Sequence, residues 1–182
     1  MTTTAPTLLD EVLPRFEVRS RHERRVAATP DRVVRVVESL RLGGASSLLL
    51  RIRGVRLPPG PIRDVLRRSG FAVLAERPGV EVVAGTTGRF WAIRGRTAVE
   101  APPDLEAFRA FDRPGCALGA ISLRVDGLGN GSTLVSTETR VRCVDDRARR
   151  RFAVYWSLIR VFSGWLRRDL LRRIARASEA AA

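Results

Sequence analysis

The sequence of 182 residues has few of the side chains that enzymes most often use for chemistry. It contains no lysine, one histidine (His22), one tyrosine (Tyr155) and two cysteines, Cys116 and Cys143. These residues form no signature of a Ser-His-Asp triad and no cluster at metal-ligand spacing. We therefore expect no metal ion, no cofactor and no assigned catalytic residue. Two isolated thiols predict small buried side chains, since they are too few for a disulfide framework.

Long apolar runs are also missing. No run of about 18 apolar residues occurs, and residues 1–7 show no basic region followed by an apolar core. The sequence therefore predicts neither a membrane-spanning helix nor a signal peptide, and we expect a cytoplasmic protein. The length suits one domain, and 45% hydrophobic with 29% charged residues is ordinary for a soluble globule.

Acidic residues are outnumbered, with 19 against 33 basic ones and a net charge of +14. All the basic residues are arginine, which together with abundant Ala, Val, Gly and Pro is what GC-rich coding would produce. They are spread along the whole chain and lack the interleaved aromatic residues of a base-stacking surface, so nucleic-acid binding is not expected. Peripheral contact with an anionic membrane stays an alternative, because arginines flank apolar residues near the C-terminus.

The longest periodic segment, residues 145–179, predicts one long helix. At about 100° per residue, its main apolar face spans roughly a third of the circumference, as in a helix buried along one side. Asp145 or Asp146 would cap its start, and the Ser163-Gly164 pair predicts a bend or a gap in the packing. The face consists of Phe152, Tyr155, Trp156, Ile159, Phe162, Leu166, Leu170 and Ile174.

The chain before this helix alternates between short helical and extended patterns. Apolar content predicts short helices at 8–13 and 46–55, and helical spacing or capping predicts helices at 29–40, 62–69 and 102–111. Two-residue alternation and turn residues predict strands at 16–28, 71–76, 80–84, 89–93, 116–126 and 132–143. The glycines and Asn130 between the last two strands favour a hairpin, whereas Gly85 to Gly88 fits either a turn or a bulge within one strand. The plan is α+β.

Three segments resemble bacterial members of the START-like, or SRPBCC, superfamily: GRFW at 88–91, FDRPGCALGAISLRV at 111–125, and STLVSTETRV at 132–141 with the DDRARRRFAVYWSLIRVFSGWLRRDLLRRI run that follows. The resemblance covers about residues 15–179, which would form the domain, and leaves residues 1–14 as an N-terminal extension. It implies a helix-grip fold, in which a strongly bent antiparallel sheet wraps around the long C-terminal helix and leaves an internal cavity. Superfamily members include carriers, cyclases and hydroxylase subunits, so the fold does not fix the function.

The cavity implied by this resemblance should lie between the sheet and the last helix. Its expected lining is Phe90 or Trp91, Ile121, Leu123, Tyr155, Ile159 and Phe162, with Gly119 and Ser163 leaving the room. The function that follows is non-covalent binding or transport of an apolar small molecule that is lipid- or polyketide-like. A polyketide cyclase or dehydrase-like enzyme is the alternative, and it would require polar groups that converge on one volume.

His22 and Tyr155 are the candidates for such polar groups. His22 shares a strand face with Phe16, Val18 and Val26, where it is either a ligand contact with acid/base capacity or a satisfied core residue. The Tyr155 hydroxyl could contact a ligand or serve helix-to-sheet packing. A pocket that gathered His22, Tyr155 and a carboxylate would favour the enzyme.

Glu138 belongs to a polar segment that could be mistaken for a site. Alternation places it with Arg140 and Arg142 on the strand face opposite Val135 and Val141, which we expect to face solvent. The resemblance implies that the first and last strands are neighbours. Glu138 would then form an exposed ion pair with Arg19, Arg21 or Arg25, of structural value only.

A second apolar stripe runs along the other side of the last helix and consists of Val154, Leu158, Val161 and Trp165. A helix that merely lies on a sheet has no need of it, so something should cover it. The apolar residues of the segment 8–13 are one candidate. A second copy of the chain, a partner protein or an anionic membrane surface are the others, which would make the protein a homodimer or an interaction module.

Overall fold

The computed structural model describes residues 6–42, 60–92 and 99–180. The helices and strands follow in the order α1 (Leu8–Val12), β1 (Val18–Val26), α2 (Pro30–Ser39), β2 (Arg41–Leu42), β3 (Gly60–Pro61), α4 (Ile62–Arg68), β4 (Ala72–Arg77), β5 (Glu81–Gly88), β6 (Val99–Glu100), α5 (Leu105–Ala110), β7 (Ala117–Gly127), β8 (Thr133–Cys143) and α6 (Asp146–Ala180). The predicted helix at 46–55 lies outside the described residues. The predicted strand at 89–93 was wrong, because residues 89–92 form a turn in which the Ala92 N–H donates to the Arg89 carbonyl at 3.2 Å.

The main sheet is antiparallel and has the strand order β1-β8-β7-β5-β4, with β6 paired to the end of β5. The hairpin predicted at 116–143 is confirmed, since β7 and β8 pair from Ala117 opposite Cys143 to Gly127 opposite Thr133. Its connection uses Gly129 at φ +74° and Gly131 at φ +73°, where a side chain would be strained. The first strand, β1, pairs with the last, β8, as the resemblance implied.

Residues 85–88 form no turn. They continue β5, which pairs with β7 from Glu81 to Gly88, and the register irregularity lies instead in β4 between Val73 and Ala75. Gly85 is needed for close packing: a Cβ there would collide with the Leu74 side chain and lie 3.0 Å from Cε2 of Phe108. Gly85 therefore serves a close contact within the strand, which continues to Gly88.

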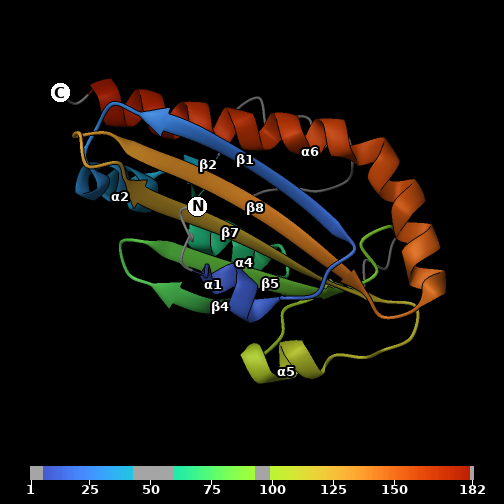
Figure 1. The fold of residues 1–182 in the computed structure, drawn as a ribbon. Coiled ribbons are helices and arrows are strands. Elements are labelled where there is room, and N and C mark those ends of the chain that lie inside the picture. Colours follow the sequence, from blue (N-terminus) through green and yellow to red (C-terminus); the bar gives the residue numbers. More distant parts are fainter. Residues whose placement is uncertain (1–5, 43–59, 93–98, 181–182) are drawn as a thin grey trace.

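The long helix α6 begins where the sequence predicted. Asp145 caps it, because its carboxylate accepts the Ala148 N–H at 2.6 Å and also the Gly115 N–H at 2.5 Å. These hydrogen bonds hold the pKa of Asp145 below its ordinary value. Figure 1 shows that α6 is bent, with its first turns curving past the end of the sheet and the rest lying along β1 and β8. The predicted α+β helix-grip fold is confirmed.

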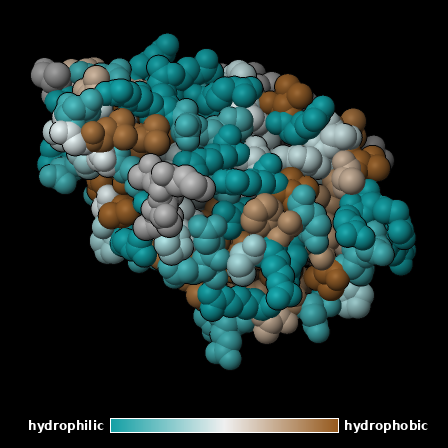
Figure 2. Space-filling model, viewed as in Figure 1, coloured by the Kyte–Doolittle hydropathy of each residue, from teal (hydrophilic) through white to brown (hydrophobic). Residues whose placement is uncertain are grey.

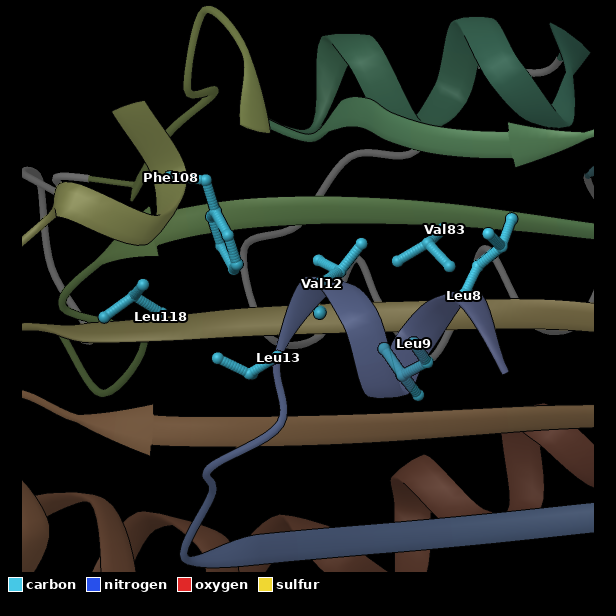
Figure 3. Close-up of a cluster of buried hydrophobic side chains, with 8 residues drawn as sticks. Leu8, Leu9, Val12, Leu13, Val83, Phe108 and Leu118 are labelled. Carbon is cyan, nitrogen blue, oxygen red and sulfur yellow. The ribbon is translucent and has the colours of Figure 1, made fainter. Parts of the chain in front are cut away.

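The N-terminal segment covers the sheet and leaves the second stripe of α6 uncovered. Helix α1 lies on the opposite face of the sheet from α6, over β5 and β7 (Figure 3). The cluster there contains Leu8, Leu9, Val12, Leu13, Val83, Phe108, Leu118 and Ala120. The idea that residues 8–13 lie across α6 was therefore wrong. The sheet is apolar on both faces at this point. The face opposite α6 therefore also has to be shielded from water, and α1 packs there.

The same cover corrects the expectation for Glu138. Its pairing with Arg19 is confirmed, with Nε to Oε1 at 2.9 Å, but Glu138 is only 6% exposed and Arg140 only 5%. Arg140 donates to Glu138 at 2.7 Å and to Asp10 of α1 at 2.6 Å, and its guanidinium lies 4.5 Å from the centre of the Phe16 ring. Alternation gave the correct face, but residues 8–16 remove that face from solvent. Phe16 thus lies on this side of the sheet, away from His22.

The aliphatic part of the second stripe of α6 is open to solvent. Val154 is 66%, Leu158 75% and Val161 70% exposed, while Trp165 is half-buried and stacks on Phe162 with ring centres 6.4 Å apart. In Figure 2 hydrophobic residues appear as separate patches within a mostly hydrophilic surface. No helix within residues 6–42, 60–92 and 99–180 is long and apolar enough to cross a membrane. Cys116 and Cys143 are buried and unpaired, as predicted.

Candidate ligand-binding site

A cavity of about 490 Å³ lies between the sheet and the C-terminal half of α6, with α2 and α4 as its other walls. The sheet contributes Val73, Val82, Ala84, Ile121, Leu123, Val125 and Thr137. The helices contribute Val34 and Val37 from α2, Ile62 and Leu66 from α4, and Leu166, Arg167, Asp169, Leu170 and Arg173 from α6. Most of this surface is aliphatic.

Strand alternation explains which residues of the sheet face the cavity. Val82 is opposite Leu123, and Ala84 is opposite Ile121, so their side chains lie side by side on the face that carries α6. Val82, Ile121 and Leu123 are only half-buried although they belong to interior strands of the sheet. Their neighbours on the other face, such as Val83, are fully buried. The face toward α6 is therefore hollow in the region where the other face is packed.

Charged side chains stand at the edge of the cavity. Arg63 of α4 donates to Glu76 of β4 at 3.1 Å, and Arg63 is 55% exposed, so this pair lies near solvent. The exposed Glu38 of α2 and Arg77 at the end of β4 also border the cavity. An aliphatic interior with a charged rim is the usual character of a site that holds a small apolar molecule.

One charged group lies deeper, on the wall formed by α6. Nη1 of Arg167 donates to the Thr137 hydroxyl at 3.2 Å, and Thr137 is only 5% exposed. The Nε atom of Arg167 is shut off from solvent and has no hydrogen-bond partner among the described residues. Burial lowers the pKa of Arg167 to about 10, which leaves it charged at neutral pH. The neighbouring Asp169 is bonded to Arg173 at 2.8 Å.

The predicted site residues fall into separate regions. Ile121 and Leu123 line the cavity. Phe90, Trp91 and Tyr155 instead surround Phe152 at the other end of α6, with ring centres 6.2, 6.1 and 5.8 Å from it.

Two more predicted residues lie toward that aromatic end. Gly119 is covered by Phe90, because a Cβ on the glycine would lie 3.2 Å from Cζ of that ring. The room left by Gly119 is thus occupied by a side chain of the protein. Between this region and the cavity, Ile159, Phe162 and Ser163 are half-buried on α6 and are not among the described residues that line the cavity.

His22 is packed against the backbone of α6. A Cβ on Gly164 would lie 3.4 Å from Cε1 and Nε2 of the imidazole, so the glycine lets the ring approach the helix. Burial lowers the pKa of His22, and the charges of Arg167 and Arg168 lower it further. Neither His22 nor Tyr155 is among the described residues that line the cavity. Across the described ranges, no three His, Cys, Asp or Glu side chains gather in a way that could hold a metal ion.

The structure adds wall residues that the sequence-based prediction of the site omitted. Val34, Val37, Ile62 and Leu66 belong to the apolar stripes of the two predicted short helices, so helical spacing could have marked them as facing inward. No sequence pattern marks Arg167 as a wall residue, because a single arginine beside an apolar helix face is ordinary in a chain with 33 basic residues.

Comparisons with known proteins give only distant matches. No family model matches the chain, and no curated protein matches it. Among solved structures, the di-domain ARO/CYC BexL from the BE-7585A biosynthetic pathway shares 14% identity at a TM-score of 0.38; the match covers 90% of this chain and 47% of BexL, so the chain spans about half the length of that protein. CalU16 from Micromonospora echinospora shares 12% identity at a TM-score of 0.31, over 91% of this chain and 96% of CalU16. Similarity at this level does not identify a ligand or an activity.

Proposed function

We propose that the protein binds or carries an apolar small molecule in the cavity between the sheet, α2, α4 and α6, as the START-like resemblance of its sequence implies. The observation that supports this most directly is the hollow itself. A volume of about 490 Å³ is within the range of about 300–1,000 Å³ that small-molecule sites occupy. Native interiors are otherwise close-packed, so an aliphatic space of this size needs an explanation.

The cyclase alternative has less support from the residues around the cavity. It requires acid and base groups that converge on the bound molecule. His22 packs against Gly164, and Tyr155 lies in the aromatic cluster around Phe152. Asp169 does line the cavity, but it is engaged with arginines of its own helix. Binding without chemistry therefore accounts for the site with fewer assumptions.

The predicted site residues that lie outside the cavity would contact a ligand longer than the cavity. Ile159, Phe162 and Ser163 follow α6 from the cavity wall at Leu166 toward the aromatic cluster. A molecule that outgrew the cavity would extend along this line, past His22, toward Phe90, Trp91 and Tyr155. The exposed residues of the second stripe are separate from this path.

Filling the cavity tests the binding function. Leu123→Trp places a large ring in the hollow, and we expect it to weaken binding of the neutral dye Nile red at least tenfold, as measured by fluorescence titration. Val154→Trp adds a similar bulk at an exposed position of α6 and should leave the affinity unchanged. Nile red binding that is unaffected by Leu123→Trp would show that the dye, and the proposed function with it, does not use this cavity.

A further inference from the structure

Arg167 is a cation that lines a mostly aliphatic cavity, and no acidic side chain among the described residues pairs with it. Of the ion pairs between described residues, none includes Arg167, and its recorded hydrogen bond goes to the neutral Thr137 hydroxyl. A buried charge without a counter-charge destabilises a protein, because the desolvation of the charge is not compensated. Such a group lowers the stability of the folded protein unless another group supplies the negative charge.

The other charged groups around the cavity do not supply it. Asp169 is bonded to Arg173 at 2.8 Å and lies 3.8 Å from Arg172. At the rim, Glu76 is held by Arg63. Glu81 is bonded to Arg124 at 3.2 Å and accepts the Leu8 N–H at 2.9 Å, on the α1 side of the sheet. Each of these carboxylates therefore already has a partner, and the remaining rim carboxylate, Glu38, is exposed on α2.

We infer that the molecule held in the cavity is an amphipathic organic acid, with its anionic group at Arg167 and Thr137 and its apolar body against the aliphatic walls. This inference rests on the proposed binding function. Arg167 lines the cavity and its recorded hydrogen bond uses only Nη1, so the guanidinium keeps further N–H donors, whose planar fork suits the two oxygens of a carboxylate. One cation without an acidic partner among the described residues balances one negative charge, which favours a singly charged acid over a doubly charged phosphate.

The body of the acid would lie on a wall formed by Val82, Ile121 and Leu123 of the sheet and by Leu166 and Leu170 of α6. Leu166 and Leu170 flank Arg167 along α6, so the apolar wall begins directly beside the charged group. This is the arrangement expected for a head group at one point and a hydrocarbon portion extending from it.

Matched ligands separate the charge from the apolar body. We expect dodecanoic acid to displace Nile red at a concentration about 10- to 100-fold lower than 1-dodecanol does, because hydrogen bonds to a charged partner are the stronger kind. In Arg167→Met this preference should disappear while the affinity for 1-dodecanol is retained, and Arg167→Lys should restore part of it. Arg160→Met, which removes an exposed arginine of the same helix, is the control and should behave as wild type. The pair 2-naphthoic acid and 2-naphthalenemethanol repeats the test with an aromatic ring in place of the alkyl chain. Comparing the two acids shows whether the cavity prefers a carboxylate on an alkyl chain or one on a ring system.

The outcomes distinguish the two proposals. Equal affinity for each acid and its alcohol in the wild type would overturn the assignment of a head-group site and leave the binding function standing. No displacement by any of the four compounds would overturn both.

A thermal melt of the ligand-free proteins separates recognition from a structural role. Arg167→Met should not lower the Tm, because it removes a partly buried charge that has no acidic partner among the described residues. A lower Tm together with an equal loss of affinity for acid and alcohol would show that Arg167 only supports the fold, and would overturn the inference.

Discussion

The imidazole of His22 lies against α6 because position 164 carries no side chain. Its surroundings are a Ser20 hydroxyl at 3.4 Å on its own strand and the positive charges of Arg167 and Arg168 on the helix. Burial and these two arginines act in the same direction, and both lower the pKa of the ring below its ordinary value of 6.5. A neutral His22 is therefore the form that the folded protein favours.

This environment predicts a loss of stability in mild acid. Because the unfolded chain binds a proton at His22 more readily than the folded one, the free energy of unfolding should fall as the pH drops below about 6.5 and stay level above it. Urea unfolding between pH 5 and 8 measures this, and His22→Asn should remove the slope in that range. The carboxylates of Asp10 and Glu138 titrate below this range, because hydrogen bonds outweigh the effect of burial and hold the pKa of Asp10 at about 2 and that of Glu138 below its ordinary value. An unchanged slope in His22→Asn would contradict this assignment.

At the scale of elements, α1 contributes more contacts to the fold than its length of five residues suggests. The helix is too short to be stable alone. A capping box fixes its start, since Asp10 N–H donates to the Thr7 hydroxyl at 3.2 Å and Thr7 N–H donates to the Asp10 carboxylate at 2.9 Å. Its carbonyl groups and Asp10 then accept hydrogen bonds from Arg140 of β8. The segment is thus bound to the sheet by both apolar and polar contacts.

Truncating one leucine of α1 should show this contribution. Leu9 is 1% exposed, and we expect Leu9→Ala to lower the free energy of unfolding by about 2–5 kcal/mol, the usual cost of removing a buried leucine side chain. The matched change Leu158→Ala, at a leucine that is 75% exposed on α6, should stay within about 0.5 kcal/mol. Denaturant unfolding of both variants provides the comparison. A large loss for Leu158→Ala would mean that a second copy of the chain covers the exposed stripe in solution.

At the scale of the whole molecule, the two faces of the sheet differ in how tightly they are packed. The face under α1 is filled by leucine, valine and phenylalanine side chains, whereas the face under α6 encloses the cavity between two packed ends. One end joins α2, β1, β7 and β8 to Leu171, Ile174 and Ala175 of α6. The other is the aromatic cluster around Phe152. The helix is therefore anchored on both sides of the hollow.

A molecule that fills this hollow should stabilise the folded state. At a free ligand concentration of about 100 times Kd, linkage gives about 2.7 kcal/mol, which in a protein of this size corresponds to a rise in Tm of roughly 5–10 °C. We expect dodecanoic acid to produce such a rise in a thermal scan, and Leu123→Trp to abolish it. A rise of the same size in Leu123→Trp would place the stabilising site outside the cavity.

The sequence by itself determined the elements and their pairing wherever the signal was local. The hairpin of β7 and β8, the cap at Asp145 and the length of α6 follow from alternation, turn residues and helical periodicity, which neighbouring residues carry. Within the site, Ile121 and Leu123 belong to the lining expected from the resemblance, and both line the cavity.

Only the tertiary structure decided what lies over each face. Alternation assigns Glu138 a side of β8 but cannot show that residues 8–16 cover that side, and an aromatic pair such as Phe90 and Trp91 fits a cavity wall as well as a packed cluster. Arg167 shows the same limit. Its sequence context is that of any surface arginine, and its position beside Thr137 depends on how α6 is placed on the sheet. Contacts between residues far apart in the chain have no local sequence signature, and these contacts determine both the cavity and the charge within it.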